Sequence, residues 1–257
     1  MNTNKDKWQI AVFCDFDGTI TYKDTGNELV KALGKEFEPW HTMLHAGEMY
    51  IRDYWRKTIS GLRLPREEEK YFDGLTAEFF AKFILNYDFD PYFADFANFC
   101  KQNDIALSVI SDGFSDYINP ALAAHGCKDI PVFANSFIYK PDGTVEPFFY
   151  AASENCNCMC ASCKRNVILS GIPTETIIVT IGDGQSDICA ARHSDIIFAK
   201  KELAAACNIE KLPHYDFKNF FDVLRIFRNL ISGTCGNNRI RPRYQAQLMR
   251  KRAFEGE

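Results

Sequence analysis

Asp15 and Asp17 are the first residues of the chain whose types and spacing suit chemistry. They come directly after residues 10–13, an apolar run typical of a buried parallel strand. Alternate residues of an extended chain point the same way, so both carboxylates can face one spot beyond the strand's carboxyl end. Two carboxylates at that spacing repel each other unless a proton or a cation lies between them. A hard divalent cation such as Mg²⁺, with a phosphate as its other ligand, satisfies both groups.

Gly18 and Thr19 complete this motif, which reads Asp-x-Asp-Gly-Thr. Glycine has no side chain, so Gly18 lets the backbone approach a phosphate closely. Asp-Gly is also a common turn pair, and a plain surface turn explains the motif when it is taken alone. The choice between a phosphate site and a turn therefore depends on what the rest of the chain places beside it.

A second set of polar residues follows the strand predicted at residues 105–110. This apolar run leads into Ser111, Asp112 and Gly113. A hydroxyl and a glycine-containing turn can hold the oxygens of an anion through O–H and backbone N–H groups. Taken alone, Ser111 is also an ordinary turn or cap residue.

A third set follows residues 176–181, the most strand-like run of the chain, where Gly-Asp-Gly-x-x-Asp contains Asp183 and Asp187. Between the second and third sets, Lys164 stands near the start of a predicted helix. Each residue has an ordinary structural explanation: a turn, a helix cap, a surface lysine. The carboxyl ends of parallel strands share one edge of a sheet, and ligands of α/β proteins bind there.

The elements that must position these motifs predict an α/β fold. We expect further strands within residues 131–150 and 195–199, and helices at residues 90–100, 115–124, 162–169, 202–207 and 217–231. Between residues 24 and 85 the pattern is helical, at residues 24–33, 49–59, from 64–69 onward and 76–85. A helical stretch directly after the first strand indicates an inserted cap instead of a βαβ repeat.

The predicted architecture is therefore a doubly wound, Rossmann-like parallel-sheet core with a small inserted α-helical cap. The core comprises residues 1–22 and 86–232, the cap residues 23–85, and a basic tail residues 233–257. We expect the arginine-rich tail to be a solvated helical or frayed segment.

Composition limits the classes of function. The chain has 257 residues, 46% of them hydrophobic, and a net charge of −4, which gives no reason to expect a nucleic-acid partner. We expect no membrane partner, because no apolar run approaches the ~20 residues that a membrane helix needs. The polar start of the chain lacks the apolar segment of a secretory signal, which predicts a cytoplasmic protein.

In this order, the three strand-end motifs and Lys164 resemble the four motifs of the haloacid dehalogenase superfamily of phosphohydrolases. The resemblance covers residues 12–187. It implies that Asp15 is a nucleophile that forms an aspartyl-phosphate. Asp17 would protonate the leaving group and then activate water, and Lys164 would neutralise the nucleophile and the phosphate.

The resemblance also implies the ligands of a Mg²⁺ ion and of the phosphate. The metal would be held by Asp15, by the backbone carbonyl of Asp17 and by Asp183, with Asp187 beside them. The phosphoryl oxygens would be held by Gly18, Thr19, Ser111, Asp112 and Gly113. The partner is a small phosphomonoester.

The inserted helices are similar to the cap of the phosphoserine-phosphatase-like branch of this superfamily. Asp24 falls near the place of a glutamate that binds the substrate amine in that branch, and Arg56 near the place of an arginine that binds the carboxylate. An ordinary helix cap and a solvated arginine explain the same two residues without a substrate.

Four cysteines, Cys156, Cys158, Cys160 and Cys163, precede Lys164. Thiolates favour zinc, but this spacing is tight for one ion, so reduced loop thiols, a zinc site and a disulfide all remain open. The cysteine-rich approach and residues 198–203 and 212–217 resemble methionine-salvage phosphatases that act on 2-hydroxy-3-keto-5-methylthiopentenyl-1-phosphate.

The resemblances leave several functions open. Phosphocholine/phosphoethanolamine phosphatases share a cysteine-rich approach to the lysine, and phosphoserine is a further candidate substrate. A mutase-type phosphotransferase would use the same nucleophile. A zinc- or redox-responsive binding module built on the four cysteines is the alternative that is not an enzyme.

Overall fold

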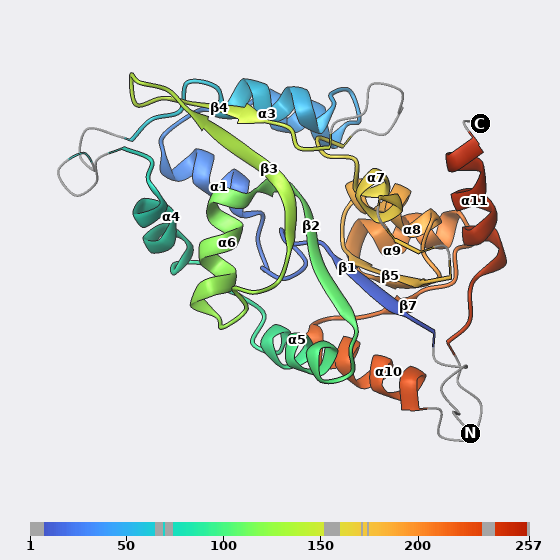
Figure 1. Ribbon diagram of the computed structural model, residues 1–257. Helices are drawn as coiled ribbons and strands as arrows, with labels where there is room; N and C mark the ends of the chain where they lie inside the picture. Colours follow the sequence, from blue (N-terminus) through green and yellow to red (C-terminus); the bar gives the residue numbers. More distant parts are fainter. Residues whose placement is uncertain are drawn as a thin grey trace. The chain divides into compact units, whose positions relative to one another are not determined.

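The computed structural model describes residues 8–64, 69, 74–151, 160–170, 172–173, 175–232 and 240–255 (Figure 1). Within them, seven strands form one sheet in the order β4-β3-β2-β1-β5-β6-β7. The strands are β1 (Ile10–Cys14), β2 (Ala106–Phe114), β3 (Val132–Tyr139), β4 (Val145–Phe148), β5 (Ile177–Gly182), β6 (Ile196–Ala199) and β7 (Tyr215–Asp216). β3 and β4 pair antiparallel, whereas β1 with β5, β5 with β6, β6 with β7 and β2 with β3 pair parallel. The predicted α/β fold with a mainly parallel sheet is confirmed.

The helices agree with most of the predicted ranges. They are α1 (Thr25–Ala32), α2 (Trp40–His45), α3 (Ile51–Ile59), α4 (Ala77–Ile84), α5 (Phe93–Gln102), α6 (Ser115–Ala124), α7 (Lys164–Leu169), α8 (Ile188–Arg192), α9 (Lys201–Ile209), α10 (Phe220–Ser232) and α11 (Tyr244–Glu255), with a 3₁₀ turn at Gln185–Asp187. Among the described residues, no strand lies between α1 and α4, as expected for the predicted cap. The helix expected from residues 64–69 onward falls largely outside the described residues.

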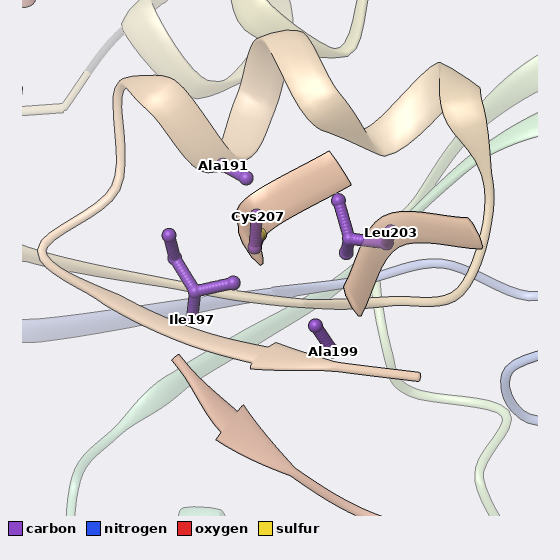
Figure 2. Close-up of a cluster of buried hydrophobic side chains, with 5 residues drawn as sticks. All are labelled: Ala191, Ile197, Ala199, Leu203 and Cys207. Carbon is purple, nitrogen blue, oxygen red and sulfur yellow. The ribbon is translucent and has the colours of Figure 1, made fainter. Parts of the chain in front are cut away.

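The chain divides into two compact units. The first contains residues 1–14, 90–108 and 165–257, and so includes β1 and the strands β5, β6 and β7. Figure 2 shows part of its core, where side chains of α8, β6 and α9 meet: Ala191, Ile197, Ala199, Leu203 and Cys207. All five are buried. This apolar layer fixes β6 and α9 beside the loop that follows β5.

Aromatic packing joins α5 and α10 in the same unit, where the two helices lie side by side (Figure 1). The ring of Phe220 lies 4.9 Å from that of Phe93 and 5.5 Å from that of Phe96, measured between centroids. The buried Asp90 carboxylate accepts hydrogen bonds from the backbone N–H groups of Tyr92 (2.9 Å) and Phe220 (3.0 Å). One aspartate therefore satisfies free donors at the starts of both helices.

The second unit contains residues 15–89 and 109–164. Its helices α4 and α6 pack together, and α3 packs against β4. Phe137 of β3 lies at the centre of an aromatic core, with its ring 4.4 Å from Phe114 and 5.5 Å from Phe80. Trp55 of α3 adds a ring 5.4 Å from Phe114. The helices predicted as a cap thus share a core with the β3–β4 hairpin.

The arginine-rich end of the chain differs from the expectation of a solvated tail. Arg250 of α11 is 8% exposed and pairs with the buried Asp195 at 3.1 Å. Arg243 donates from its side chain to the carbonyls of Ser194 (2.9 Å) and Ala191 (2.8 Å). The expectation is wrong for these two arginines because a buried carboxylate needs a cationic partner, and carbonyls at and just after the end of α8 accept further hydrogen bonds from a cation. Residues 233–239 lie outside the described residues.

Candidate active site

Asp15 stands directly after β1 and pairs with Lys164, the first residue of α7. The Lys164 Nζ lies 2.6 Å from Oδ1 of Asp15, across 149 positions of sequence. Asp15 is 6% exposed and Lys164 is 2% exposed. Because isolated charges are costly to bury, the two groups depend on each other. This pairing places a buried carboxylate beside a fixed positive charge, an arrangement that suits nucleophilic attack on an anionic phosphate.

Asp17, two residues further on, has a different environment. Its Oδ1 accepts the backbone N–H of Thr25 at the start of α1 (2.8 Å), and its Oδ2 accepts the hydroxyl of Tyr117 in α6 (2.8 Å). Burial raises the pKa of Asp17 to about 7, with a smaller contribution from the Asp24 carboxylate, although the two hydrogen bonds act in the opposite direction. A carboxyl group with a pKa near neutrality can both donate and accept a proton.

The turn between Asp17 and Thr21 is tight and mostly buried. Gly18 has a φ of +77°, a conformation that strongly favours glycine. The backbone N–H groups of Thr19 and Ile20 both donate to the carbonyl of Phe16, at 3.2 and 2.8 Å. The motif therefore forms a turn, but its residues are mostly buried at the end of the first strand, so it is not the plain surface turn of the alternative explanation.

The second motif lies inside β2 instead of in a turn after it. β2 continues to Phe114, and its register with β3 shifts between Ile110 and Phe114. Within this irregular stretch, the Ser111 hydroxyl accepts the Gly113 N–H at 2.9 Å. The expected turn is replaced by a bulge-like irregularity because the end of a strand depends on its pairing partner, which the local sequence does not specify.

Asp112 of this motif links β2 to two distant segments. Its Oδ1 accepts the backbone N–H of Ser162 at 2.6 Å, just before α7. Its carbonyl accepts the side-chain amide of Asn135 in β3 at 2.8 Å. The first contact ties the second motif to the segment that ends in Lys164.

The third motif begins where β5 ends. Oδ2 of the buried Asp187 accepts the backbone N–H groups of Asp183 and Gly184, both at 3.1 Å. A side chain at Gly182 would overlap the Asp187 carboxyl group, so the turn requires glycine there. Oδ2 of Asp183 lies 2.8 Å from Nζ of Lys201, a residue with an exposed side chain. The pairing of Lys201 with Asp183 was not predicted.

Strand register explains how the first and third motifs come to the same sheet edge. β1 and β5 are parallel neighbours, with Cys14 opposite Ile181. Asp15 follows Cys14 directly, and Asp183 follows Ile181 by two residues. The carboxylates of Asp183 and Asp187 in the first unit are buried, as is that of Asp15 in the second, and carboxylate oxygens are the hard donors that a divalent cation such as Mg²⁺ prefers.

The structure places the two predicted cap residues in local roles. Asp24 is exposed and caps α1, where its carboxylate accepts the Asn27 N–H at 2.8 Å. Arg56 is exposed, lies 3.2 Å from the Asp53 carboxylate and covers the ring of Phe149 at 5.5 Å. Their contact with a substrate remains a prediction.

Tyr117 is the site residue that sequence reasoning missed most clearly. It occupies an early position of an apolar helix and is fully buried, so its pattern resembles that of a core residue. No motif signals its hydroxyl. Only the fold brings it to Asp17, 100 positions away.

The cysteine-rich segment is only partly described. Cys156 and Cys158 lie outside the described residues, whereas Cys160 is half-buried and Cys163 is buried. In the part of the chain that the structure describes, these two cysteines do not belong to a group of three or more potential metal ligands.

A membrane-spanning helix is absent from the described residues, because none of their helices is both long and apolar enough to cross a bilayer.

Known proteins with similar sequences and folds agree with this geometry. The chain is 26% identical to a 2-hydroxy-3-keto-5-methylthiopentenyl-1-phosphate phosphatase of Brevibacillus brevis, over 86% of this chain and 96% of the relative. It is 27% identical to Pdp3-interacting factor 1 of Schizosaccharomyces pombe, over 87% and 97%. A solved phosphoserine phosphatase, an analogue of its phospho-aspartyl intermediate, shares the fold with a TM-score of 0.61 at 19% identity, over 86% of this chain and 99% of that one.

The match to a whole family covers the motifs themselves. The family model for haloacid dehalogenase-like hydrolases matches residues 12–192. This range begins within β1 and ends in α8, and it contains the three strand ends and Lys164. Since the match extends over well more than half of the sequence, the chain belongs to the haloacid dehalogenase-like hydrolase family.

Proposed function

We propose that this enzyme, a phosphatase of the haloacid dehalogenase superfamily, is a Mg²⁺-dependent hydrolase of a small phosphomonoester. One observation carries the proposal: the loop after β1 holds two carboxylates in opposite environments. Asp15 is paired with the Lys164 ammonium group, whereas burial raises the pKa of Asp17 to about 7. Neighbouring carboxyl groups with such different environments are suited to separate roles, one as nucleophile and one as acid and base.

In the proposed mechanism, an Asp15 oxygen attacks phosphorus and forms an acyl phosphate. The bond from phosphorus to the ester oxygen breaks, and protonated Asp17 gives its proton to the departing alkoxide. Asp17, now ionised, then takes a proton from the water that attacks the acyl phosphate. This releases inorganic phosphate and restores the Asp15 carboxylate. Lys164 lowers the energy of the charge that builds up on the phosphoryl oxygens.

The metal and the phosphate complete the proposed site. Mg²⁺ would be held by Asp15, the backbone carbonyl of Asp17 and Asp183, with Asp187 beside them, and it would neutralise phosphate charge. The phosphoryl oxygens would be held by Gly18, Thr19, Ser111, Asp112 and Gly113. The Ser111 hydroxyl accepts the Gly113 N–H at 2.9 Å and can donate its own proton to such an anion.

We propose that residues 23–85 act as a cap that selects the substrate. The methionine-salvage substrate 2-hydroxy-3-keto-5-methylthiopentenyl-1-phosphate is supported by the relatives named for it, which match over nearly their whole length. Phosphoserine, phosphocholine and phosphoethanolamine require a group that binds an amine. Asp24, the acidic residue considered for this role, caps α1 and keeps acceptor capacity for such a group, so the choice of substrate rests on the relatives.

Phosphate release from a panel of monoesters tests the proposal. The panel contains the methionine-salvage ester, phosphoserine, phosphocholine and phosphoethanolamine, each with Mg²⁺ and with EDTA. We expect one ester to be hydrolysed far faster than the others, and its turnover to be lost with EDTA. Transfer of the phosphoryl group to a second substrate, without phosphate release, would indicate a phosphotransferase instead.

The metal content of the purified protein distinguishes the proposed phosphatase from the alternative that is not an enzyme. About one tightly held zinc per chain, together with no phosphatase activity, would favour a zinc-responsive module built on Cys156, Cys158, Cys160 and Cys163. Active protein without zinc would exclude this module and leave these cysteines as reduced thiols or a disulfide.

A further inference from the structure

We propose that Tyr117 is a positioning residue that orients Asp17 for proton transfer to the leaving group. The inference deepens the proposed function and rests on it. It follows from the contacts of one carboxyl group, from the space around it and from the packing of the tyrosine ring.

The Asp17 carboxyl group is held at both oxygens. The Thr25 N–H bonds Oδ1 and the Tyr117 hydroxyl bonds Oδ2, each at 2.8 Å. One hydrogen bond would leave the carboxyl group free to turn about that contact. Two bonds from different helices, α1 and α6, fix its plane as well as its position.

Two glycines provide the space for this arrangement. A side chain at Gly113 would overlap both the Tyr117 hydroxyl and Oδ2 of Asp17. A side chain at Gly26 would lie 2.6 Å from the ring of Trp55 and 3.2 Å from the Tyr117 hydroxyl. The second motif thus contributes a residue whose lack of a side chain admits the tyrosine to Asp17.

The ring of Tyr117 is itself immobilised. Tyr117 is completely buried, and its ring centroid lies 6.3 Å from those of Phe16 and Phe114. A phenol is protonated at neutral pH, so the Tyr117 hydroxyl acts as the donor to the Asp17 carboxyl group.

The reason for such an anchor lies in the geometry of proton transfer. A general acid must lie within hydrogen-bonding reach of the atom it protonates, and a displacement of about 1 Å can cost about 100-fold in rate. The backbone of the turn is held by hydrogen bonds to the Phe16 carbonyl, but these bonds do not reach the Asp17 carboxyl group. Tyr117 restrains that group from α6.

The test is the Tyr117→Phe variant, which keeps the ring and removes the hydroxyl. The probes are 2,4-dinitrophenyl, 4-nitrophenyl and phenyl phosphate, which need increasing assistance from an acid as the leaving group becomes poorer. The quantity compared is kcat/KM at one pH, because it reports on the steps up to departure of the leaving group. We expect a loss of about 10- to 100-fold for phenyl phosphate and little change for the dinitrophenyl ester.

Tyr54→Phe is the matched control. Its hydroxyl is also held in this unit, where it donates to Oδ1 of Asn27 at 2.6 Å, and the residue is 1% exposed. Loss of this hydroxyl should leave the dependence of kcat/KM on the leaving group unchanged. In an Asp17→Asn background, adding Tyr117→Phe should not change how kcat/KM varies with the leaving group, because the acid is already absent.

Equal losses for the three esters in Tyr117→Phe would overturn the inference and leave Tyr117 as a core residue. If the wild type hydrolyses neither these aryl esters nor any ester of the panel above, the proposed function fails, and crystal structures then decide the positioning role alone. We expect one Asp17 conformation in the wild type and in Tyr54→Phe, and a displaced or split carboxyl group in Tyr117→Phe. An unchanged Asp17 in that variant would refute the role.

Discussion

The loops after β1 and β5 each follow a buried parallel strand with two aspartates, but they hold these aspartates by different means. In the β1 loop, Asp15 is bonded by Lys164 and Asp17 by Tyr117, which lie 149 and 100 positions further along the chain. These side chains come from two other segments of the chain, so the orientation of the two carboxyl groups depends on tertiary contacts.

In the β5 loop, the contacts are local. Asp187 accepts backbone N–H groups from Asp183 and Gly184, four and three positions before it. Asp183 also pairs with Lys201, whose side chain is 53% exposed. The β5 loop is thus held by contacts within a few residues, whereas the two carboxyl groups of the β1 loop are oriented by residues that are distant in the sequence.

The largest effect is expected from Lys164→Met. It leaves Asp15 buried without its ammonium partner and removes the positive charge beside the phosphate. We expect kcat/KM to fall by about 1,000-fold. Unfolding in urea with EDTA should show a loss of about 3 kcal/mol of stability, because one member of a buried pair remains.

Lys164→Arg is the control, since it keeps the charge and changes the shape. It should recover much of the stability but little of the activity. A Lys164→Met variant as active as the wild type would show that the buried pair is not part of the catalytic machinery.

A smaller and more selective effect is expected from Asp187→Asn. The amide oxygen can still accept the N–H groups of Asp183 and Gly184, so the turn should persist and only the charge is lost. We expect the Mg²⁺ concentration for half-maximal activity to rise by about 10- to 100-fold, with the thermal midpoint in EDTA nearly unchanged.

The matched variant Asp187→Ala removes the acceptor as well as the charge and should also lower the thermal midpoint. If Asp187→Asn unfolds as readily as Asp187→Ala, the carboxylate charge itself stabilises the turn. The local account of this loop would then be incorrect.

The smallest effect is expected from Lys201→Met, the same substitution as at Lys164 but in an exposed pair. Exposed ion pairs contribute little, so stability should change by less than about 1 kcal/mol. Removal of a cation from Asp183 should tighten Mg²⁺ binding by less than about tenfold, as measured by titration calorimetry. A loss of activity as large as that in Lys164→Met would remove the contrast between the two loops.

Sequence reasoning recovered the parts of the fold that are local. Apolar runs predicted β1, β2, β5 and β6, and the spacing of Asp183 and Asp187 on one turn followed from adjacent residues. β7, at Tyr215–Asp216, has two exposed residues and carries no pattern that could reveal it. Short strands of this kind are defined by their neighbours.

What could not be predicted depends on contacts between distant segments. Ser111 was expected after the strand, yet β2 continues through it with a shifted register. Tyr117 resembles a core residue until the fold brings Asp17 to its hydroxyl. Asp195 and Arg250 are ordinary surface charges by sequence, and only packing of α11 buries them together.

The most direct test of the account is to trap the phosphorylated enzyme. The protein is mixed with a hydrolysed monoester in Mg²⁺, quenched in acid and reduced with borohydride, which converts an aspartyl phosphate to homoserine. Mass spectrometry of the peptides should find homoserine at position 15, and none in Asp15→Asn, whose fold should be intact. Turnover in Asp15→Asn, or an adduct at another residue, would contradict the assignment of Asp15 as the nucleophile.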